Sequence, residues 1–260
     1  MIELPSASQD YSPEEMMVCC AARQIRDGET IFVGIGLTIL SGLVAKKTHA
    51  PNCLLLFESG VVGAPPQKTV LSIADPHLVT NSLMVVDFFD FFTMFLQNGH
   101  VDLGFLGGAQ VDKYGNINST VIGDYLKPKV RFPGGGGAFD MTLAKRTVIM
   151  MPHEKRRFVE SVDFVTVPGH VVRGKVRDEL GLTRGGPDTL VTTRGIFKFS
   201  ADGEAYLVSV HPNFSVEDVK RETGWELKVA PTVETTLPPT SAELQALRLL
   251  DPDQLVVKRK

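Results

Sequence analysis

Three short apolar runs, each ended by a glycine-containing turn, constrain the fold of this chain more than any other feature. They are residues 30–33 before Gly34-Ile35-Gly36, residues 53–57 before Glu58-Ser59-Gly60, and residues 103–106 before Gly107-Gly108-Ala109. A continuously apolar run predicts a strand buried on both faces. Residues 38–47 predict a helix directly after the first turn, because their apolar side chains recur at helical spacing. This order predicts an α/β fold with a mostly parallel central sheet and flanking helices.

The rest of the chain predicts further strands and two more helices. Ser12, with Pro13 and Glu15, forms a capping box for a helix that ends at Gly28, and residues 240–243 can cap a last helix. Additional strands are expected at residues 147–151, 162–166 and 190–193, and a hairpin at 196–199 with 205–210.

No internal repeat or linker divides the chain. Residues 231–239 contain three prolines and no helical period, so they predict a surface connection. We therefore expect one domain over residues 1–230 and a C-terminal extension, residues 231–260, packed on the same domain.

Composition excludes several classes of protein. Hydrophobic residues make up 43% and charged residues 22% of the chain, as in ordinary globular proteins. A net charge of -3 gives no electrostatic footprint for nucleic acid. Cys19, Cys20 and Cys53 fit neither a disulfide framework nor a zinc site, and no signal peptide or membrane span is evident. A cytoplasmic location and no contact with membranes are expected.

Glu58 is the candidate reactive side chain, because it directly follows a strand of five apolar residues. In open α/β sheets, ligands bind at the carboxyl ends of the strands, where turns and helix N-termini leave backbone N–H groups free. If the strands are parallel, Glu58 lies beside the glycine turns. A carboxylate that attacks a thioester develops an oxyanion, which such N–H groups stabilise. The alternative is a strand that simply ends in a polar residue.

Other segments carry weaker signals. Gln110 and Asn118 follow the third strand and can supply amide hydrogen bonds to a ligand or to neighbouring loops. Four successive glycines at residues 134–137 leave a backbone that a ligand arm can approach closely, or a loop that is only flexible. Three cations at residues 155–157 can meet phosphates, although a solvated helix start is the simpler explanation.

The histidines support neither a metal site nor a Ser-His-Asp hydrolase. No second histidine follows His153 at helical spacing, and no histidine is placed beside Ser59 by the sequence.

Taken together, these segments resemble the family I CoA-transferases, most closely the B (beta) subunits of the glutaconate type. The runs that carry the resemblance occur in one order through most of the chain. They are the Gly-x-Gly turn at residues 33–37, Glu58-Ser59-Gly60, residues 107–110 and 114–120, residues 122–125, Gly136-Gly137-Ala138, and residues 149–151 with 153–158.

The resemblance implies that Glu58 is a nucleophile that forms an acyl-glutamyl anhydride and then a glutamyl-CoA thioester. It implies that Gly34 and Gly36 help to form an oxyanion hole and that Gly136, Gly137 and Ala138 lie against the thioester arm, with Gln110 and Asn118 among the substrate-binding residues. It also implies an acyl-CoA substrate, no metal or organic cofactor, and a homologous alpha (A) subunit, commonly in a heterotetramer.

Two departures from the family pattern leave the reaction open. Thr38 stands where the family's turn usually has proline, and residues 87–97 contain five phenylalanines, which predict a bulkier or more apolar acyl group if they line the pocket. The main hypothesis is transfer of CoA between an acyl-CoA and a dicarboxylic or branched acid. The alternatives are an acyl-CoA decarboxylase or C–C bond hydrolase that uses Glu58 as acid or base, and a non-enzymatic ligand-binding or assembly subunit.

Overall fold

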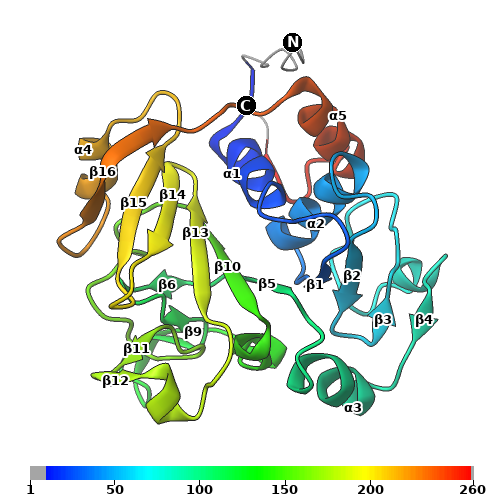
Figure 1. Ribbon diagram of the computed structural model, residues 1–260, viewed down its shortest axis with the longest axis horizontal. Helices are drawn as coiled ribbons and strands as arrows, with labels where there is room; N and C mark the ends of the chain where they lie inside the picture. Colours follow the sequence, from blue (N-terminus) through cyan, green and yellow to red (C-terminus); the bar gives the residue numbers. More distant parts are fainter. Residues whose placement is uncertain (1–9, 259–260) are drawn as a thin grey trace. The chain divides into compact units, whose positions relative to one another are not determined.

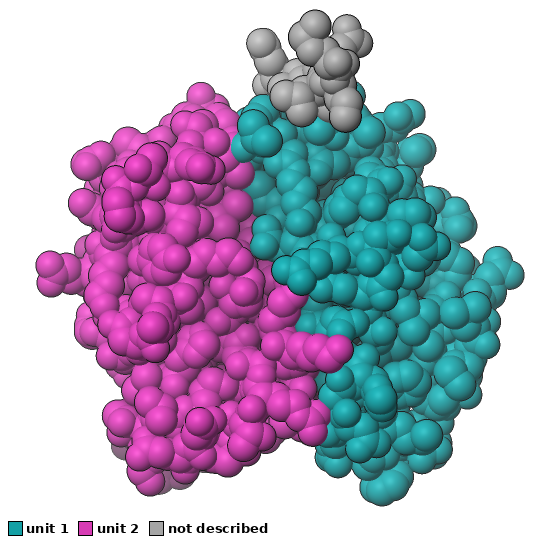
Figure 2. Space-filling model, in the orientation of Figure 1, with its two compact units in different colours: residues 1–105, 237–260 teal, residues 106–236 magenta. Residues whose placement is uncertain are grey.

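The computed structural model describes residues 10–258, which divide into two compact units. Unit 1 takes in the chain up to Phe105 and again from Leu237 onward, and unit 2 spans Leu106–Thr236 (Figure 2). Each unit is built around strands of its own.

Unit 1 carries the parallel strands that the sequence predicted. β1 pairs in parallel with β2 on one side and with β5 on the other, and β3 and β4 continue from β2 in antiparallel fashion. Helices α1, α2 and α5 pack against one another (Figure 1). The elements of unit 1 are α1 (Pro13–Ala22), β1 (Thr30–Phe32), α2 (Leu37–Lys47), β2 (Leu54–Phe57), β3 (Val61–Val62), η1 (Pro76–Val79), β4 (Met84–Val85), α3 (Phe88–Asp90), the π-helix η2 (Phe91–Gln97), β5 (Leu103–Leu106) and α5 (Ser241–Leu250).

Unit 2 has five strands in the order β16-β15-β14-β13-β10, and three small hairpins. The β10–β13 and β15–β16 pairs are parallel, whereas β14 is antiparallel to both of its neighbours. The elements of unit 2 are β6 (Gln110–Val111), β7 (Ile117–Asn118), β8 (Val121–Gly123), β9 (Pro128–Arg131), η3 (Gly136–Ala138), η4 (Asp140–Leu143), β10 (Arg146–Met151), β11 (Val171–Val172), β12 (Lys175–Val176), η5 (Arg177–Leu180), β13 (Pro187–Thr192), β14 (Gly195–Phe199), β15 (Ala205–Val210), α4 (Val216–Arg221) and β16 (Lys228–Thr235).

The predicted α/β class with a mostly parallel sheet and flanking helices is confirmed, and so are the capping boxes at Ser12 and Thr240. Three predictions are wrong. Residues 162–166 form no strand, because the Asp163 N–H donates to the Gln110 side chain and the segment meets Ile117 of β7 at its very end, in an isolated bridge at Val167. Pro231 lies inside β16, not in a surface connection, because an edge strand tolerates a residue without an N–H donor. The first helix also ends at Ala22, well before Gly28.

The structure divides the chain at other places than the sequence suggested. The predicted boundary between residues 1–230 and 231–260 lies within β16, which belongs to unit 2. The residues from Leu237 onward return to unit 1, where α5 packs on α1 and α2. The C-terminal segment is therefore part of the unit that begins the chain.

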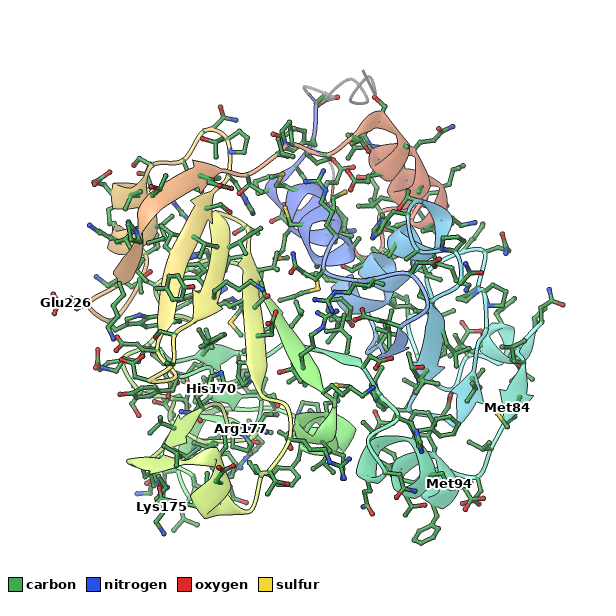
Figure 3. All side chains as sticks on the ribbon, viewed as in Figure 1. Met84, Met94, His170, Lys175, Arg177 and Glu226 are labelled. Atoms are coloured by element: carbon green, nitrogen blue, oxygen red, sulfur yellow. The ribbon has the colours of Figure 1, made fainter. Side chains whose placement is uncertain are left out.

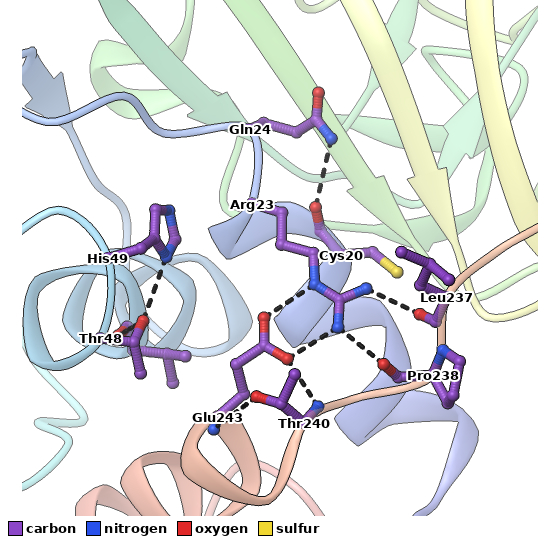
Figure 4. A network of polar contacts seen from close by, with 10 residues as sticks. Cys20, Arg23, Gln24, Thr48, His49, Leu237, Pro238, Thr240 and Glu243 are labelled. Carbon is purple, nitrogen blue, oxygen red and sulfur yellow. Dashed lines mark hydrogen bonds and ion pairs between the residues drawn. The ribbon is translucent and has the colours of Figure 1, made fainter. Parts of the chain in front are cut away.

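Arg23 at the end of α1 holds this C-terminal segment in place (Figure 4). Its guanidinium donates to both carboxylate oxygens of Glu243, each at 2.7 Å, and to the carbonyl oxygens of Leu237 and Pro238 at 2.7 and 2.8 Å. The Glu243 side chain is only 7% exposed. The ion pair is bidentate and largely removed from water, so the loss of either side chain is expected to destabilise the protein.

Arg23→Met is expected to lower the free energy of unfolding by about 3 kcal/mol, because it leaves the Glu243 carboxylate buried without its cation. Urea unfolding monitored by circular dichroism measures the change. Arg221→Met is the matched control, since Arg221 is 64% exposed and pairs with Asp218 at the surface. This control should cost less than about 0.5 kcal/mol. Equal losses in the two variants would contradict a structural role for the Arg23 network.

Candidate active site

Glu58 opens a three-residue hairpin loop between β2 and β3. Phe57 pairs with Val61, and the Gly60 N–H donates to the Phe57 carbonyl oxygen at 2.9 Å. Gly60 has φ +86°, the left-handed value that the last residue of such a loop requires and that glycine adopts without strain. The sharp turn predicted after Phe57 is thus present, and it brings Glu58 to the end of the strand, where its side chain is half-buried.

A second contact fixes this loop against the segment that follows β4. The Val86 N–H donates to the Gly60 carbonyl oxygen at 2.9 Å, and a Cβ atom on Gly60 would lie 2.2 Å from the Val86 carbonyl oxygen. Only a residue without a side chain allows this approach. The backbone at Gly60 therefore determines where Glu58 stands.

Gly60→Ala is expected to destabilise the protein by about 3 kcal/mol, from backbone strain at positive φ together with the clash against Val86. Gly28→Ala is the control, because Gly28 has φ +83° but nothing within 4 Å of the added methyl group. The control should cost about 1 kcal/mol. Thermal or urea unfolding compares the two, and a Gly60→Ala protein as stable as Gly28→Ala would show that the approach to Val86 does not constrain the loop.

The turn after β1 leads directly into α2. Gly36 is the N-cap of α2 with φ +84° and ψ −129°, a combination open mainly to glycine. No side chain caps this helix, and the first N–H groups of a helix have no acceptor within it. Thr38 is buried, and its hydroxyl reaches the Ile35 carbonyl oxygen at 3.5 Å. Thr38, which stands where the family's turn usually has proline, thus contributes a weak hydrogen bond to the turn.

The two turns lie at the same edge of the sheet in unit 1. β1 and β2 are parallel with Phe32 opposite Leu56, and the Val33 N–H still donates to the Leu56 carbonyl oxygen at 3.1 Å. Gly34 and Glu58 each stand two residues beyond this pair. A carboxylate therefore lies beside a glycine turn and a helix N-terminus, which favours the stabilisation of negative charge.

The other predicted site residues lie in unit 2. Gly136–Ala138 form the 3₁₀ turn η3, in which Gly137 is buried. Gly134 has φ +101° with open space around it, whereas a Cβ on Gly135 would lie 2.8 Å from Thr166 Cγ2. The glycine loop thus packs tightly on one side and is accessible on another.

Gln110 and Asn118 are buried, and their amide groups bond to protein partners. Asn118 Nδ2 donates to Gln110 Oε1 at 2.7 Å and to the Val121 carbonyl oxygen at 2.6 Å, and Asn118 Oδ1 accepts from Thr120 and Val121. Gln110 Nε2 donates to Asp163 Oδ2 at 3.2 Å. These contacts favour a supporting role, since a ligand would have to displace an existing bond. Their direct contact with substrate stays a prediction.

The charged run at residues 153–157 begins with a buried histidine. His153 Nδ1 and Nε2 lie 3.2 and 3.1 Å from the hydroxyls of Thr192 and Thr223, and its ring stacks on Phe158. Burial, with lesser contributions from Arg194 and His211, lowers the pKa of His153 to about 3. Glu154 pairs with Arg156 and Arg157, so these two cations are partly neutralised within the run. Lys155 has no such ion pair among the described residues.

The neutral state of His153 gives a pH-dependent contribution to stability. The unfolded chain takes up a proton near pH 6.5 and the folded chain does not, so stability falls as pH decreases from 6.5 toward 3. Relative to His153→Gln, the wild type should lose about 2 kcal/mol of unfolding free energy between about pH 7.5 and pH 5. Urea titrations at both pH values measure this difference. Identical pH dependence in the two proteins would show that His153 titrates normally.

Two structural features of unit 1 were not indicated by the sequence: the surroundings of the Ser59 hydroxyl and the helical form of the phenylalanine-rich stretch at residues 87–97. Ser59 Oγ is buried and has no hydrogen-bond partner among the described residues, although a local sequence gives no sign of this. The phenylalanine-rich stretch forms α3 and a π-helix, with Phe91 and Phe92 packed on Phe32 of β1, while Phe88 and Phe89 are 59% and 71% exposed. This segment therefore has some phenylalanine side chains buried against β1 and others exposed at the surface.

Residues 10–258 contain no cluster of three or more histidine, cysteine, aspartate or glutamate side chains arranged to hold a metal ion. Within the same residues, every helix is too short or too polar to cross a membrane.

Comparison with known proteins agrees with the sequence motifs. The family model described as coenzyme A transferase matches residues 14–222. The chain is 43% identical to the B chain of the 3-oxoadipate CoA-transferase of Pseudomonas knackmussii, over 93% of this chain and 94% of that protein. It is 37% identical to the B chain of the glutaconate CoA-transferase of Acidaminococcus fermentans, over 96% of each. Both relatives are named as subunits of their enzymes.

Two solved structures are similar over nearly the whole chain. The crystal structure of glutaconate coenzyme A-transferase from Acidaminococcus fermentans superposes with a TM-score of 0.89 at 35% identity, covering 98% of this chain and all of that chain. The decarboxylase AibA/AibB gives a TM-score of 0.80 at 29% identity, covering 95% of this chain and 97% of that chain.

Proposed function

The chain belongs to the coenzyme A transferase family and is the B-type subunit of a two-subunit CoA-transferase, and from this premise we propose that Glu58 is its nucleophile. The observation that carries the proposal is the position of Glu58, which lies at the carboxyl end of β2 beside the uncapped N-terminus of α2. A carboxylate and a glycine turn therefore meet at this edge of unit 1. The companion is a homologous A-type subunit, and we propose that the two form a heterotetramer.

The reaction proceeds through covalent intermediates on Glu58. Its carboxylate attacks the thioester carbonyl carbon, a C–O bond forms, the C–S bond breaks, and CoA thiolate leaves an acyl-glutamyl anhydride. The thiolate then attacks the glutamyl carbonyl and releases the first acid, which gives a glutamyl-CoA thioester. A second carboxylate reverses these steps and leaves with CoA, so no net proton or redox change is required.

Backbone N–H groups stabilise the oxyanion of each tetrahedral intermediate. The amides at the start of α2 have no side-chain cap, and the positive end of the helix dipole is directed to the same place. The Ser59 hydroxyl, buried without a partner among residues 10–258, supplies a further donor when substrate is bound.

The acyl groups are those of dicarboxylic acids. Relatives at 43% and 37% identity are named for 3-oxoadipate and glutaconate, both of which carry a second carboxylate. The exposed aromatic side chains of residues 88–89 favour a longer or more apolar chain between the carboxylates if they reach the pocket.

The experiment is co-expression with the companion subunit, followed by incubation with succinyl-CoA and either 3-oxoadipate or glutaconate. Formation of the new acyl-CoA, strictly dependent on the acceptor acid, is the expected result. A complex that consumes no acyl-CoA with any dicarboxylic acceptor would contradict the proposal.

Decarboxylation is the second candidate, because the decarboxylase AibA/AibB shares the fold at 29% identity. In that case Glu58 acts as an acid or base and not as a nucleophile. Release of carbon dioxide from glutaconyl-CoA in the absence of any acceptor acid would favour this candidate. Transfer without carbon dioxide release would exclude it.

A further inference from the structure

Unit 1 contains a cavity in the segment that connects β3 to β4 (Figure 1). Its volume is about 540 Å³, which lies within the roughly 300–1,000 Å³ of small-molecule sites. Pro65, Pro66 and Val70 form the apolar part of its wall. The rest of the wall is polar and includes Gln67, Lys68, Thr69, His77, Thr80 and Asn81. A wall with so many polar groups favours a polar ligand over an apolar one.

The cavity lies beyond the end of β3 that is opposite to Glu58. β3 runs antiparallel to β2, and the chain leaves β3 where the Gly63 N–H donates to the Leu55 carbonyl oxygen at 2.8 Å. Because a strand rises about 3.3 Å per residue, Gly63 is roughly 10 Å from Gly60 along β3. The cavity is therefore separate from the glycine turn and the carboxylate of the proposed reaction.

One hydroxyl of the wall is buried without a partner. Thr69 Oγ1 has no hydrogen-bond partner among residues 10–258. The Thr69 N–H donates to the Leu250 carbonyl oxygen at 2.7 Å, so the end of α5 fixes the backbone that carries this hydroxyl. A buried hydroxyl that makes no hydrogen bond is unfavourable. A ligand in the cavity that accepts a hydrogen bond from Thr69 would remove this cost.

Lys68 brings a positive charge to the same wall. Lys68 is exposed, and its side chain makes no hydrogen bond or ion pair in the part of the chain that the structure describes. A cationic ligand would be repelled by this ammonium group, and an apolar ligand would leave it without a partner. The charge therefore favours an anionic ligand.

His77 is held by Asp75 with one ring nitrogen open. Asp75 Oδ1 lies 2.7 Å from His77 Nδ1 and accepts from the His77 backbone N–H at 2.9 Å. These contacts lower the pKa of the Asp75 carboxyl, so this group is a carboxylate at neutral pH. The His77 side chain is 82% exposed, and its Nε2 has no partner among the described residues. A protonated ring bound to Asp75 through Nδ1 therefore directs its second N–H to a ligand.

Together these groups fit an oxyanion. The Lys68 ammonium, a protonated His77 and the Thr69 hydroxyl are all donors, and the two cations outnumber the one carboxylate of Asp75. Carboxylate and phosphate groups offer several acceptor oxygens and form strong charge-assisted hydrogen bonds. The cavity is larger than either group alone, so the ligand also has an organic body that the remaining polar wall can bind.

We propose that this cavity binds a small organic anion, whose carboxylate or phosphate group pairs with Lys68 and His77 and accepts from the Thr69 hydroxyl. The inference is independent of the proposed reaction, because none of these residues takes part in it and the test involves no thioester.

Calorimetric titration of the complex with the companion subunit, at constant ionic strength, tests the site with three related probes: glycerol 3-phosphate, glycerate and glycerol. At least one of the two anions should bind, and glycerol, which lacks the charge, should bind at least about tenfold more weakly. Binding of only one anion identifies the recognised group as phosphate or carboxylate. No binding of either anion, or equal binding of glycerol, would overturn the inference.

Variants locate the binding. Lys68→Gln/His77→Gln should weaken binding of the anion by about tenfold or more, because two charge-assisted contacts are lost. Thr69→Val keeps the shape of the side chain and should weaken binding by about fivefold through the loss of one hydrogen bond. Lys47→Gln/His100→Gln is the matched control, since both residues are exposed and neither lines the cavity, and it should change nothing. Equal dissociation constants for the wild type and the Lys68→Gln/His77→Gln variant would contradict the assignment.

Discussion

Glu58→Gln is expected to lower the rate of CoA transfer by at least about 10⁴-fold, because glutamine has the shape of glutamate but cannot attack a thioester. The loop itself should persist. Its conformation depends on the Gly60 N–H bond to Phe57 and on the contact with Val86, and neither involves the Glu58 carboxylate. The change therefore separates chemistry from structure.

The measurement is the steady-state transfer rate of the complex, together with its unfolding midpoint. Glu226→Gln, which removes an exposed carboxylate labelled in Figure 3, is the matched control and should retain full activity. A Glu58→Gln complex within about tenfold of the wild type, at equal stability, would mean that another group carries the acyl chemistry.

Gly36→Ala should lower kcat by about 10²–10³-fold, the loss found when one oxyanion donor is misplaced. Gly36 combines φ +84° with ψ −129°, so an alanine there must shift the backbone that presents the first N–H groups of α2. The added methyl group meets nothing within 4 Å, so the effect comes from the backbone and not from a clash.

Gly28→Ala is again the control, since it places a methyl group at φ +83° in open space away from the turn. Both variants should lose similar stability, about 1 kcal/mol, and only Gly36→Ala should lose activity. Transfer rates that fall equally in the two variants would remove the turn from the proposed mechanism.

The central strands could be predicted because their side chains are buried on both faces. β1, β2, β5 and β10 are continuously apolar over most of their length, and a run of that kind has few other places in a globular protein. β3 and β4 are only two residues long, and both residues of β4 are exposed. β3 pairs with β2 and β4 pairs with β3, and no local sequence pattern indicates either pairing.

The candidate site likewise contains residues that the sequence could locate and contacts that it could not. Glu58 could be located because a charged residue directly after a buried strand must leave the core. The approach of Gly60 to Val86 joins residues far apart in the sequence, and the buried Ser59 hydroxyl has no local sequence signal, so neither could be predicted. For Gln110 and Asn118 the sequence suggested contacts with a ligand, whereas in the structure their side chains hydrogen-bond to each other.

Trapping the covalent intermediate tests the central claim most directly. The complex is incubated with acyl-CoA without an acceptor acid, treated with borohydride, and digested for peptide mass spectrometry. Burial raises the pKa of the Cys20 thiol to about 12 and that of Cys53 to about 11, and burial also raises the pKa of Cys19, so thiols should not compete for the acyl group. We predict reduction of the Glu58 side chain to its alcohol and no other carboxylate modified. An active complex in which the Glu58 peptide stays unchanged would contradict the account.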